Sequence, residues 1–493
     1  MKEFKMHVFS KVLAIVVLTV VAGLLPTLQA QSGTQGLNTI YGTTTSIQGS
    51  ASSIDARLYV GSQDLCFALN TIINSISVSG AVIDARGVSG TALNCASTPW
   101  STVPSGTFSN AIILLPAGTI TIRSPWLMPS NTRIVGSGQG ITTIQACKTT
   151  TTGCGGVGFS GTPTAMIAMT AGNDYAVGGN DAWGCQASFV CFAVSVADLT
   201  LDAQSQAIDG IDNNDAEELS YVQHVSMVNI GGVGLKLSAD PNDTSQSCTS
   251  NCIAGTSSHS GPYTDLTIAV TSTATACVQV LNTANHSAEP RGIHGLSCTC
   301  AVSGTACSTA NPNAGIYLDG NNTTLENVFV NGFTDGVSIG DAASAVTPVH
   351  TAIVSNITGG TNVTNLIHIH KPSDSGASQA GESGGFTILA ATSAANNTIF
   401  DELTSTTLLF SKDPYVGMYI LADPVGNNSG YPAGYTRFTT SSSLPTWFVG
   451  ATTVSTGAGT CSSFANGTLY SNTAGALGST LYACASGGWT VVK

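Results

Sequence analysis

Four residues in the chain have side chains suited to acid–base chemistry. Asp212, Lys236, Tyr317 and His368 supply a carboxylate, an amine, a phenol and an imidazole, and each follows an apolar residue. A polysaccharide lyase needs a base that removes the proton beside a carboxylate, and a cationic group that stabilises the charge that develops. We therefore predict these four residues as candidate catalytic groups.

Further polar residues accompany these four. Gln279 and Ser338 occupy equivalent positions in other repeats, and Asp319 and His370 lie two residues beyond such a position. We predict that these four bind substrate. A second interpretation is that the acid and the amine form a surface ion pair, worth at most about 1 kcal/mol, and that the other residues only solvate a strip of surface.

An acidic run at residues 209–218, DGIDNNDAEE, offers other chemistry. Glycosidases use two carboxyl groups about 5 to 9 Å apart, and this run contains several. Asp209, Asp212 and Asp215 could also bind calcium, although the run lacks the spacing of an EF-hand, and an acidic turn is the alternative interpretation. The cysteine spacings match no compact zinc motif, and we predict no other metal or cofactor.

These candidates recur because the chain repeats a pair of β-strands from about residue 196 onward. Apolar residues alternate with polar ones in each strand, which is typical of a strand with one buried face. The predicted inward residues of the first strands are Leu199 and Leu201, Val225 and Met227, Leu266 and Ile268, Leu296 and Cys298, Val328 and Val330, and Ile353 and Ser355. Those of the second strands are Ile211, Leu235 and Leu237, Val278 and Val280, Ile316 and Leu318, Val337 and Ile339, and Ile367 and Ile369.

Stacking of these repeats would line the remaining residues up in columns. Side chains alternate along a strand, and parallel turns stack about 4.8 Å apart. The outward column of the second strands then contains the predicted site residues. The outward residues of the first strands, among them Asp198, His224, Asp265 and Asn327, are mostly small and polar. We therefore predict that the chemistry lies on the second strands.

Composition favours a secreted all-β solenoid. Charged residues are 8% of the chain and Gly numbers 55, which suits stacked strands with tight corners better than helical bundles. Acidic residues number 27 against 14 basic ones, a net charge of -13, and such a surface repels nucleic acid. We therefore predict no nucleic-acid partner.

The first 30 residues are predicted to be a signal peptide. A basic start precedes an apolar run of 14 residues, with Ala30 as the last residue removed. A bilayer span needs roughly 20 residues, so an uncleaved anchor is the alternative, and we predict no membrane span in the mature form. The 14 cysteines of a secreted or extracellular protein favour disulfides. Attachment to the cell surface is left open. The close pairs predicted to form are Cys147 with Cys154, Cys185 with Cys191, Cys248 with Cys252, and Cys461 with Cys484.

Four regions follow from these patterns. Residues 31–60 form a linker or loose arm after the signal peptide at 1–30. An amphipathic helix begins behind the capping residue Asp64 and covers the open end of a solenoid that runs over 61–455. A loop insertion interrupts the solenoid at about 148–186. Residues 456–493 form a small β module bracketed by disulfide-forming cysteines.

Residues 111–146, AIILLPAGTITIRSPWLMPSNTRIVGSGQGITTIQA, contain three short β-type runs separated by turn formers. Together with a preceding helix and the phrase GAVIDARG at 80–87, this wording resembles the pectin-lyase-like superfamily of the pectate lyase type. The resemblance implies an all-β, right-handed parallel β-helix with an N-terminal capping helix. The segment Gly292-Ile293-His294-Gly295 is only superficially similar to the Gly-His-Gly motif of one branch. No catalytic residue is carried over from the superfamily.

Two functional hypotheses remain open at this point. The first is a secreted enzyme that acts on a polysaccharide laid along the outward column, by a lyase-like or glycosidase-like reaction. The second is a non-catalytic, adhesin-like or structural β-helix that binds glycans. Both hypotheses predict a polysaccharide or a cell-surface glycan as partner, and the sequence leaves the oligomeric state open.

Overall fold

The computed structural model describes 53–75, 80–100, 111–129, 131–161, 163–169, 193–213, 216, 219–238, 260–283, 286–287, 290–300, 314–319, 323–339, 352–369, 386–393, 397–401, 415–421, 437–441, 469–471, 481–485 and 488–491. The predicted signal peptide lies outside these residues, as do Cys185, Cys191, Cys248, Cys252 and Cys461. The statements that follow concern the described residues.

A first long sheet is built from strands that pair in parallel. In order across the sheet they are β1 (Ser53–Asp55), β2 (Ala81–Asp84), β4 (Ala111–Leu114), β7 (Arg133–Val135), β10 (Ser195–Asp202), β12 (Tyr221–Ile230), β14 (Tyr263–Val270), β18 (Ile293–Cys300), β20 (Thr323–Asn331), β22 (Ala352–Gly359) and β24 (Phe386–Ser393). A branch of β3 (Asn94–Cys95), β5 (Gly118–Ile122) and β8 (Thr142–Ala146) joins it at β10. Beyond β24, β26 (Tyr415–Leu421) and β27 (Arg437–Ser441) continue it antiparallel.

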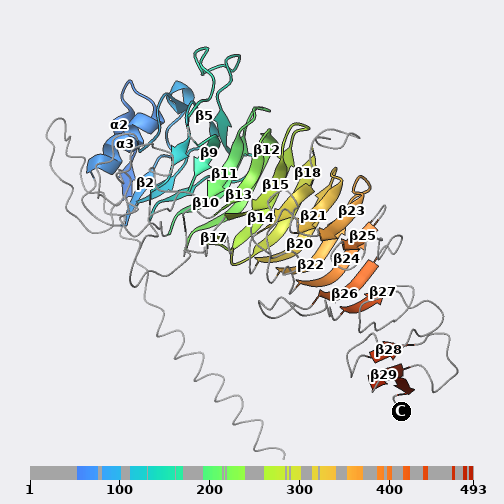
Figure 1. The fold of residues 1–493 in the computed structure, drawn as a ribbon. Coiled ribbons are helices and arrows are strands. Elements are labelled where there is room, and N and C mark those ends of the chain that lie inside the picture. Colours follow the sequence, from blue (N-terminus) through green and yellow to red (C-terminus); the bar gives the residue numbers. More distant parts are fainter. Residues whose placement is uncertain are drawn as a thin grey trace, which may run out of the picture. The chain divides into compact units, whose positions relative to one another are not determined.

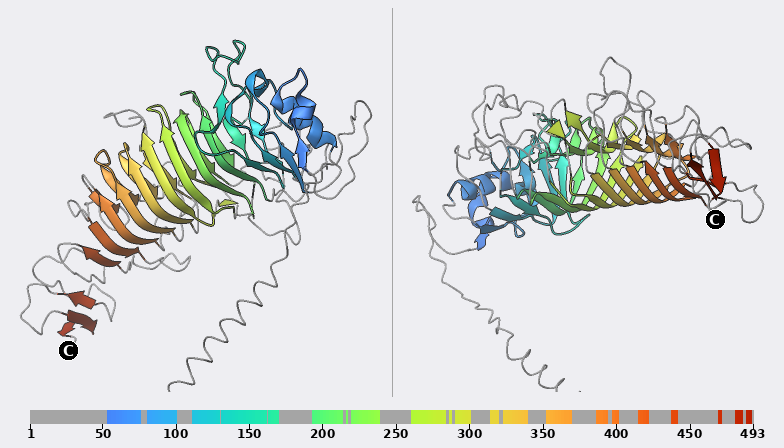
Figure 2. Two further views of the ribbon diagram at one scale, coloured as in Figure 1. Left: turned by 180° about the vertical axis from the view of Figure 1, so that it is seen from behind. Right: turned by 60° about the horizontal axis from the view of Figure 1, so that its bottom comes forward.

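A second sheet receives one strand from each turn of the chain. Its strands are β6 (Trp126–Leu127), β9 (Ala165–Ala168), β11 (Asp209–Asn213), β13 (Val233–Leu237), β15 (Ala276–Val280), β19 (Ala314–Leu318), β21 (Asp335–Ile339), β23 (Asn365–Ile369) and β25 (Asn397–Asp401). All neighbouring strands in it are parallel. Figures 1 and 2 show strands of successive turns side by side. The chain is a right-handed parallel β-helix, which confirms the predicted fold.

Apolar side chains from both sheets fill the interior of the coil. Leu199 lies opposite Val225 in the first sheet, and Leu296 lies opposite Val328. All four are at most 3% exposed, and the second-strand residues predicted to face inward are buried with them. Each turn therefore stabilises the next by burying a continuous apolar stack, as expected for a solenoid.

The first turns carry the predicted helical cap. Helix α3 (Leu65–Ser75) buries its apolar face, including Leu69 and Ile72, and follows the short helix α2 (Arg57–Val60). Asp64 caps α3, because its Oδ1 accepts the backbone N–H of Phe67 at 2.8 Å. A disulfide between Cys66 and Cys95 joins α3 to β3. The 3-10 helix η1 (Gly90–Leu93) precedes β3.

A left-handed backbone residue interrupts most long strands of the first sheet at the same height. We call these residues the left-handed column. Each directly precedes an inward residue, so two successive side chains face outward before the chain turns in again. Because neighbouring strands carry this residue at the same height, the register between them is kept across it. The column consists of Asp198, His224, Asp265, Gly295, Asn327, Asn356 and Ala390, with φ between 50° and 68°.

The left-handed column explains one error in the predicted register. Ile353 and Ser355 were predicted to face inward, but Ile357 pairs with Val328 and is fully buried, whereas Ile353 is 39% exposed. The left-handed residue Asn356 adds a second outward position and shifts the alternation, so simple alternation assigned this turn wrongly. The register of the second strands is confirmed in every turn from β11 to β23.

Two boundaries differ from the sequence prediction. Residues 53–60, assigned to the arm, form β1 and α2, because Ile54 packs into the core. The insertion at 148–186 contains β9, whose Ile167 lies opposite Ile211. Within the predicted solenoid at 61–455, β24 and β25 add a parallel turn.

Smaller elements complete the described chain. The end of the chain forms a three-stranded antiparallel sheet of β28 (Leu469–Ser471), β29 (Leu481–Ala485) and β30 (Gly488–Val491), which confirms a small C-terminal β element. A hairpin pairs β16 (Asn282–Thr283) with β17 (His286–Ser287). The predicted disulfide between Cys147 and Cys154 is confirmed, and Cys277 is bonded to Cys298. Among the described residues, no helix is long and apolar enough to cross a bilayer.

Candidate functional site

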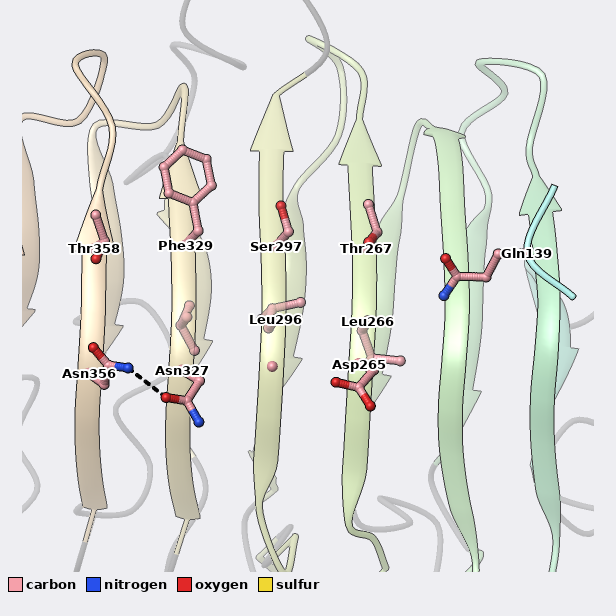
Figure 3. Close-up of a pocket in the computed structure, with 12 residues that line it drawn as sticks. Gln139, Asp265, Leu266, Thr267, Leu296, Ser297, Asn327, Phe329, Asn356 and Thr358 are labelled. Carbon is pink, nitrogen blue, oxygen red and sulfur yellow. Dashed lines mark hydrogen bonds between the residues drawn. The ribbon is translucent and has the colours of Figure 1, made fainter.

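A groove with a volume of about 640 Å³ crosses the outer surface of the first sheet. It runs over β14, β18, β20 and β22, and Gln139 contributes to one end. Figure 3 shows two rows of side chains along it. The lower row contains Asp265, Asn327 and Asn356 of the left-handed column, and the upper row contains Thr267, Ser297, Phe329 and Thr358.

The lower row has a gap at Gly295, which has no side chain. Gly295 occupies the column position between Asp265 and Asn327 and has φ +68°. A Cβ atom built there would lie 2.8 Å from Oδ1 of Asp265. The missing side chain therefore leaves a notch, with the Asp265 carboxylate on one wall and the Asn327 amide on the other. We call this space the Gly295 notch.

The Asn327 wall is fixed by a bond to the next turn. Asn356 Nδ2 donates to Asn327 Oδ1 at 2.6 Å, and both residues have left-handed backbones. Asn adopts this conformation more readily than most residues. The bond occupies the Asn327 oxygen and turns its Nδ2 toward β18 (Figure 3). The Gly295 notch therefore has a hydrogen-bond acceptor on one side, the Asp265 carboxylate, and a hydrogen-bond donor on the other, Asn327 Nδ2.

Next to the groove, the same column forms a chain of acid and base groups over three turns. His224 Nδ1 lies 3.2 Å from Asp198 Oδ1, and His224 Nε2 lies 3.1 Å from Asp265 Oδ2. All three side chains are between 43% and 61% exposed. A neutral imidazole donates from one nitrogen and a protonated one donates from both, so His224 can pass or hold a proton between two carboxylates.

A second His–carboxylate pair lies in the adjacent outward column. His294 Nδ1 is 3.2 Å from Glu326 Oε2, and both side chains are partly exposed. These two residues are in register on β18 and β20. Carboxylates are therefore concentrated on the surface that carries the groove.

The predicted column on the second strands exists but is covered. Asp212, Lys236, Gln279, Tyr317, Ser338 and His368 lie opposite one another in register from β11 to β23. Every residue of β19, β21 and β23 is buried, however, so the outer face of these strands is not an open strip. The expected groove is therefore not exposed over these three strands, whereas the Lys236 side chain on β13 is 31% exposed. Alternation tells which residues leave the interior but not what covers them.

The side chains of this column make ion pairs and hydrogen bonds with other side chains of the protein. Lys236 Nζ lies 3.1 Å from Asp212 Oδ2, as in the ion-pair interpretation, with Asp212 1% exposed. His368 Nδ1 lies 2.7 Å from Asp335 Oδ2, and Asn365 Nδ2 donates to Asp335 Oδ1 at 2.7 Å. The catalytic roles assigned to Asp212, Lys236, Tyr317 and His368 remain predictions, as do the binding roles of Gln279, Ser338 and Asp319.

Part of the predicted acidic and histidine set lies outside the described residues. Asp215 and His370 belong to this part, so the calcium site and the role of His370 remain predictions. Asp209 is described: its Oδ1 accepts the backbone N–H of Val233 at 2.7 Å. Burial raises the pKa of Asp209 to about 6, against the lowering effect of the Val233 N–H and of Lys236.

The residues of the groove were not predicted as a site from the sequence. Asp265 and Asn327 were recognised as outward residues, but Gly295, Asn356 and Phe329 were not connected with them. A signal was present, because polar residues and Gly that tolerate a left-handed backbone recur one position before each inward residue. A pattern that alternates strictly between inward and outward residues cannot detect this second outward residue.

The fold and this surface define a parallel β-helix protein with a polar groove across its first sheet. The superfamily that the sequence resembles has this fold. No protein-family model and no curated protein matches the chain.

Several solved structures resemble the coil. ORF18 of Geobacillus virus E2 has 12% identity and a TM-score of 0.37, covering 90% of this chain and 86% of its own. The A-module of mannuronan C-5 epimerase AlgE6 from Azotobacter vinelandii has 14% identity and a TM-score of 0.28, covering 65% and 90%. Pectin methylesterase from carrot has 13% identity and a TM-score of 0.28, covering 64% and 90%. Function is therefore argued from this chain's own residues.

Proposed function

We propose that this protein binds a polysaccharide lengthwise in the groove of the first sheet. The Gly295 notch carries the proposal, because the groove lining has the Asp265 carboxylate, an acceptor, on one side of Gly295 and the Asn327 amide, a donor, on the other. Successive turns repeat about every 4.8 Å along the groove. A ligand made of repeating, hydroxyl-bearing rings can contact equivalent groups in several turns.

The chemistry of the lining suits a sugar chain. Hydroxyl and amide side chains supply short donors and acceptors, and Phe329, 39% exposed, offers an aromatic face for the C–H side of a sugar ring. None of the described lining residues is Lys or Arg. With a net charge of -13, the chain repels nucleic acid and other polyanions.

The proposal includes secretion. Residues 1–30 have the pattern of a signal peptide, and disulfides such as Cys66–Cys95 form in oxidising compartments. Sequencing the N-terminus of the exported protein tests this point. A start at Gln31 is expected, and a retained Met1 in an exported protein would contradict cleavage.

Cleavage of the bound chain is the second candidate function, favoured by one observation. The His224 imidazole lies between the carboxylates of Asp198 and Asp265 beside the Gly295 notch. Carboxyl and imidazole groups transfer protons in glycan cleavage. The competing location is the second-strand column with Lys236, Tyr317 and His368. A non-catalytic, adhesin-like role requires the groove alone.

One experiment separates these functions. Purified protein is titrated with starch, galactomannan, arabinoxylan and polygalacturonate, and new reducing ends and unsaturated products are followed in parallel. Saturable binding of a neutral polysaccharide supports the proposal. Binding without products favours the adhesin-like role, and absence of binding to every polymer rejects the proposal.

A further inference from the structure

We infer that the groove prefers a glycan bearing free amino groups, with Asp265 as the residue that selects the amine. The inference rests on the proposed function, since it names the class of glycan for the same groove. It follows from where the oxygens of Asp265 point and from the charges around them.

The two carboxylate oxygens of Asp265 have different surroundings. Oδ2 lies 3.1 Å from Nε2 of His224. Oδ1 lies beside Gly295 in the groove lining, 2.8 Å from where a Cβ of residue 295 would stand. With 61% of the Asp265 side chain exposed, a ligand entering the notch meets a carboxylate oxygen directly.

An ammonium group matches this oxygen better than a hydroxyl does. Charge-assisted hydrogen bonds are shorter and stronger than neutral ones. A protonated amine offers three donors, and the carboxylate is an acceptor only. The opposite wall, Asn327 Nδ2, remains able to donate to a neighbouring hydroxyl of the same ring.

The surface around the groove also carries negative charge. Asp198 and Glu326 flank the groove, and the described lining contains no Lys or Arg that would compete with the ligand's amine. His224 and His294 are the cationic candidates nearby, and each already faces a carboxylate. The net charge of -13 adds a long-range field that attracts cations and repels polyuronates.

The inference excludes a carboxylated sugar chain as the preferred ligand. A uronate in the notch would bring its carboxylate toward Asp265 Oδ1, with no described basic lining residue to offset the repulsion. An N-acetylated amino sugar can enter the notch, but it is neutral and lacks the positive charge that pairs with Asp265. The expected order of affinity is therefore free amine, then neutral sugar, then uronate.

The test compares chitosan oligosaccharides, their N-acetylated chitin counterparts of equal length, and polygalacturonate oligosaccharides by calorimetry. At mildly acidic pH and low salt, chitosan is expected to bind about 2- to 5-fold more tightly than chitin for each engaged amine, and high salt should reduce this difference. Asp265→Asn should remove the preference for chitosan while leaving chitin binding within about twofold.

Asp202→Asn is the matched control. It removes the same charge from strand β10 of the same sheet, but at a residue outside both the groove lining and the Asp198–His224–Asp265 chain. It should keep the preference. Equal binding of chitosan and chitin by the wild type, a preference that survives Asp265→Asn, or strongest binding of polygalacturonate would each overturn the inference while leaving glycan binding intact. Failure to bind any of the three, together with the neutral polysaccharides above, rejects the proposed function itself.

Discussion

The Nε2 atom of His224 lies 3.1 Å from Oδ2 of Asp265, which belongs to the next turn of the coil. Both residues have left-handed backbones and stand at the same height on neighbouring strands. The other oxygen of Asp265 borders the Gly295 notch. The left-handed column therefore connects the Asp198–His224–Asp265 contacts with the Gly295 notch.

If the protein cleaves its ligand, His224→Asn should lower the rate by about 100-fold or more, because an imidazole that transfers protons contributes on that order. Asn suits the left-handed backbone of residue 224, so the fold should be kept. Release of reducing ends is the measurement. Lys236→Ala and His368→Ala serve as comparisons, and a loss of activity confined to these two variants would place the reaction on the second strands.

The left-handed column should matter for stability. Asn356→Ala puts a Cβ-bearing residue without a local hydrogen bond at φ 50°, which costs about 1–2 kcal/mol. Asn356→Gly loses the same bond to Asn327 without the backbone strain. Urea denaturation should rank Asn356→Gly above Asn356→Ala by about 1 kcal/mol. Equal stabilities of the two variants would show that the backbone is not strained there.

Asp209 should make the fold less stable as pH rises. Its pKa is raised from 3.8 to about 6 by burial, so between these values the unfolded chain releases the proton first. Stability is expected to fall through this window by about 1–3 kcal/mol. Asp209→Asn keeps an acceptor for the Val233 N–H and should be more stable than the wild type at neutral pH.

The comparison that checks this is urea denaturation of both proteins from acidic to neutral pH. The difference in unfolding free energy between variant and wild type should grow as pH passes from below 3.8 to above about 6. A difference independent of pH would mean that the Asp209 carboxyl is not destabilised by burial.

The disulfide between α3 and β3 should stabilise more than a local one. Cys66 and Cys95 are 29 residues apart, and Cys147 and Cys154 are 7 apart. Loop-closure entropy gives about 3.6 and about 2.4 kcal/mol for these separations. Replacing each pair by Ala and measuring thermal unfolding should show the larger loss for Cys66/Cys95. The reverse order would indicate that the helical cap docks independently of its disulfide.

The fold was predictable because its signals are local and repeated. Alternation identified the inward residues Leu235, Val278 and Ile316 correctly, and the stacking of identical turns then fixed their register. The cap was predictable for the same reason, since Asp64 and the apolar face of α3 are close in sequence.

The groove was not predictable by the same means. Asn356 and Asn327 are 29 residues apart, and their contact depends on a left-handed residue in each strand that alternation does not reveal. The burial of Tyr317 and Ser338 was also not predictable, because pattern shows only that a residue leaves the interior. A contact between residues far apart in sequence and the covering of a surface can be recognised only in the three-dimensional structure.

Titration of wild-type protein and Gly295→Asn with the polysaccharide that the wild type binds tests the central claim most directly. Asn fits the left-handed backbone, as at Asn327 and Asn356, but its side chain fills the notch beside Asp265. Ile353→Ala, an exposed site on β22 outside the groove lining, is the control. We predict that Gly295→Asn weakens binding about 10-fold or more, equivalent to about 1.4 kcal/mol, while Ile353→Ala binds like the wild type. Unchanged affinity of a folded Gly295→Asn protein would contradict binding in this groove.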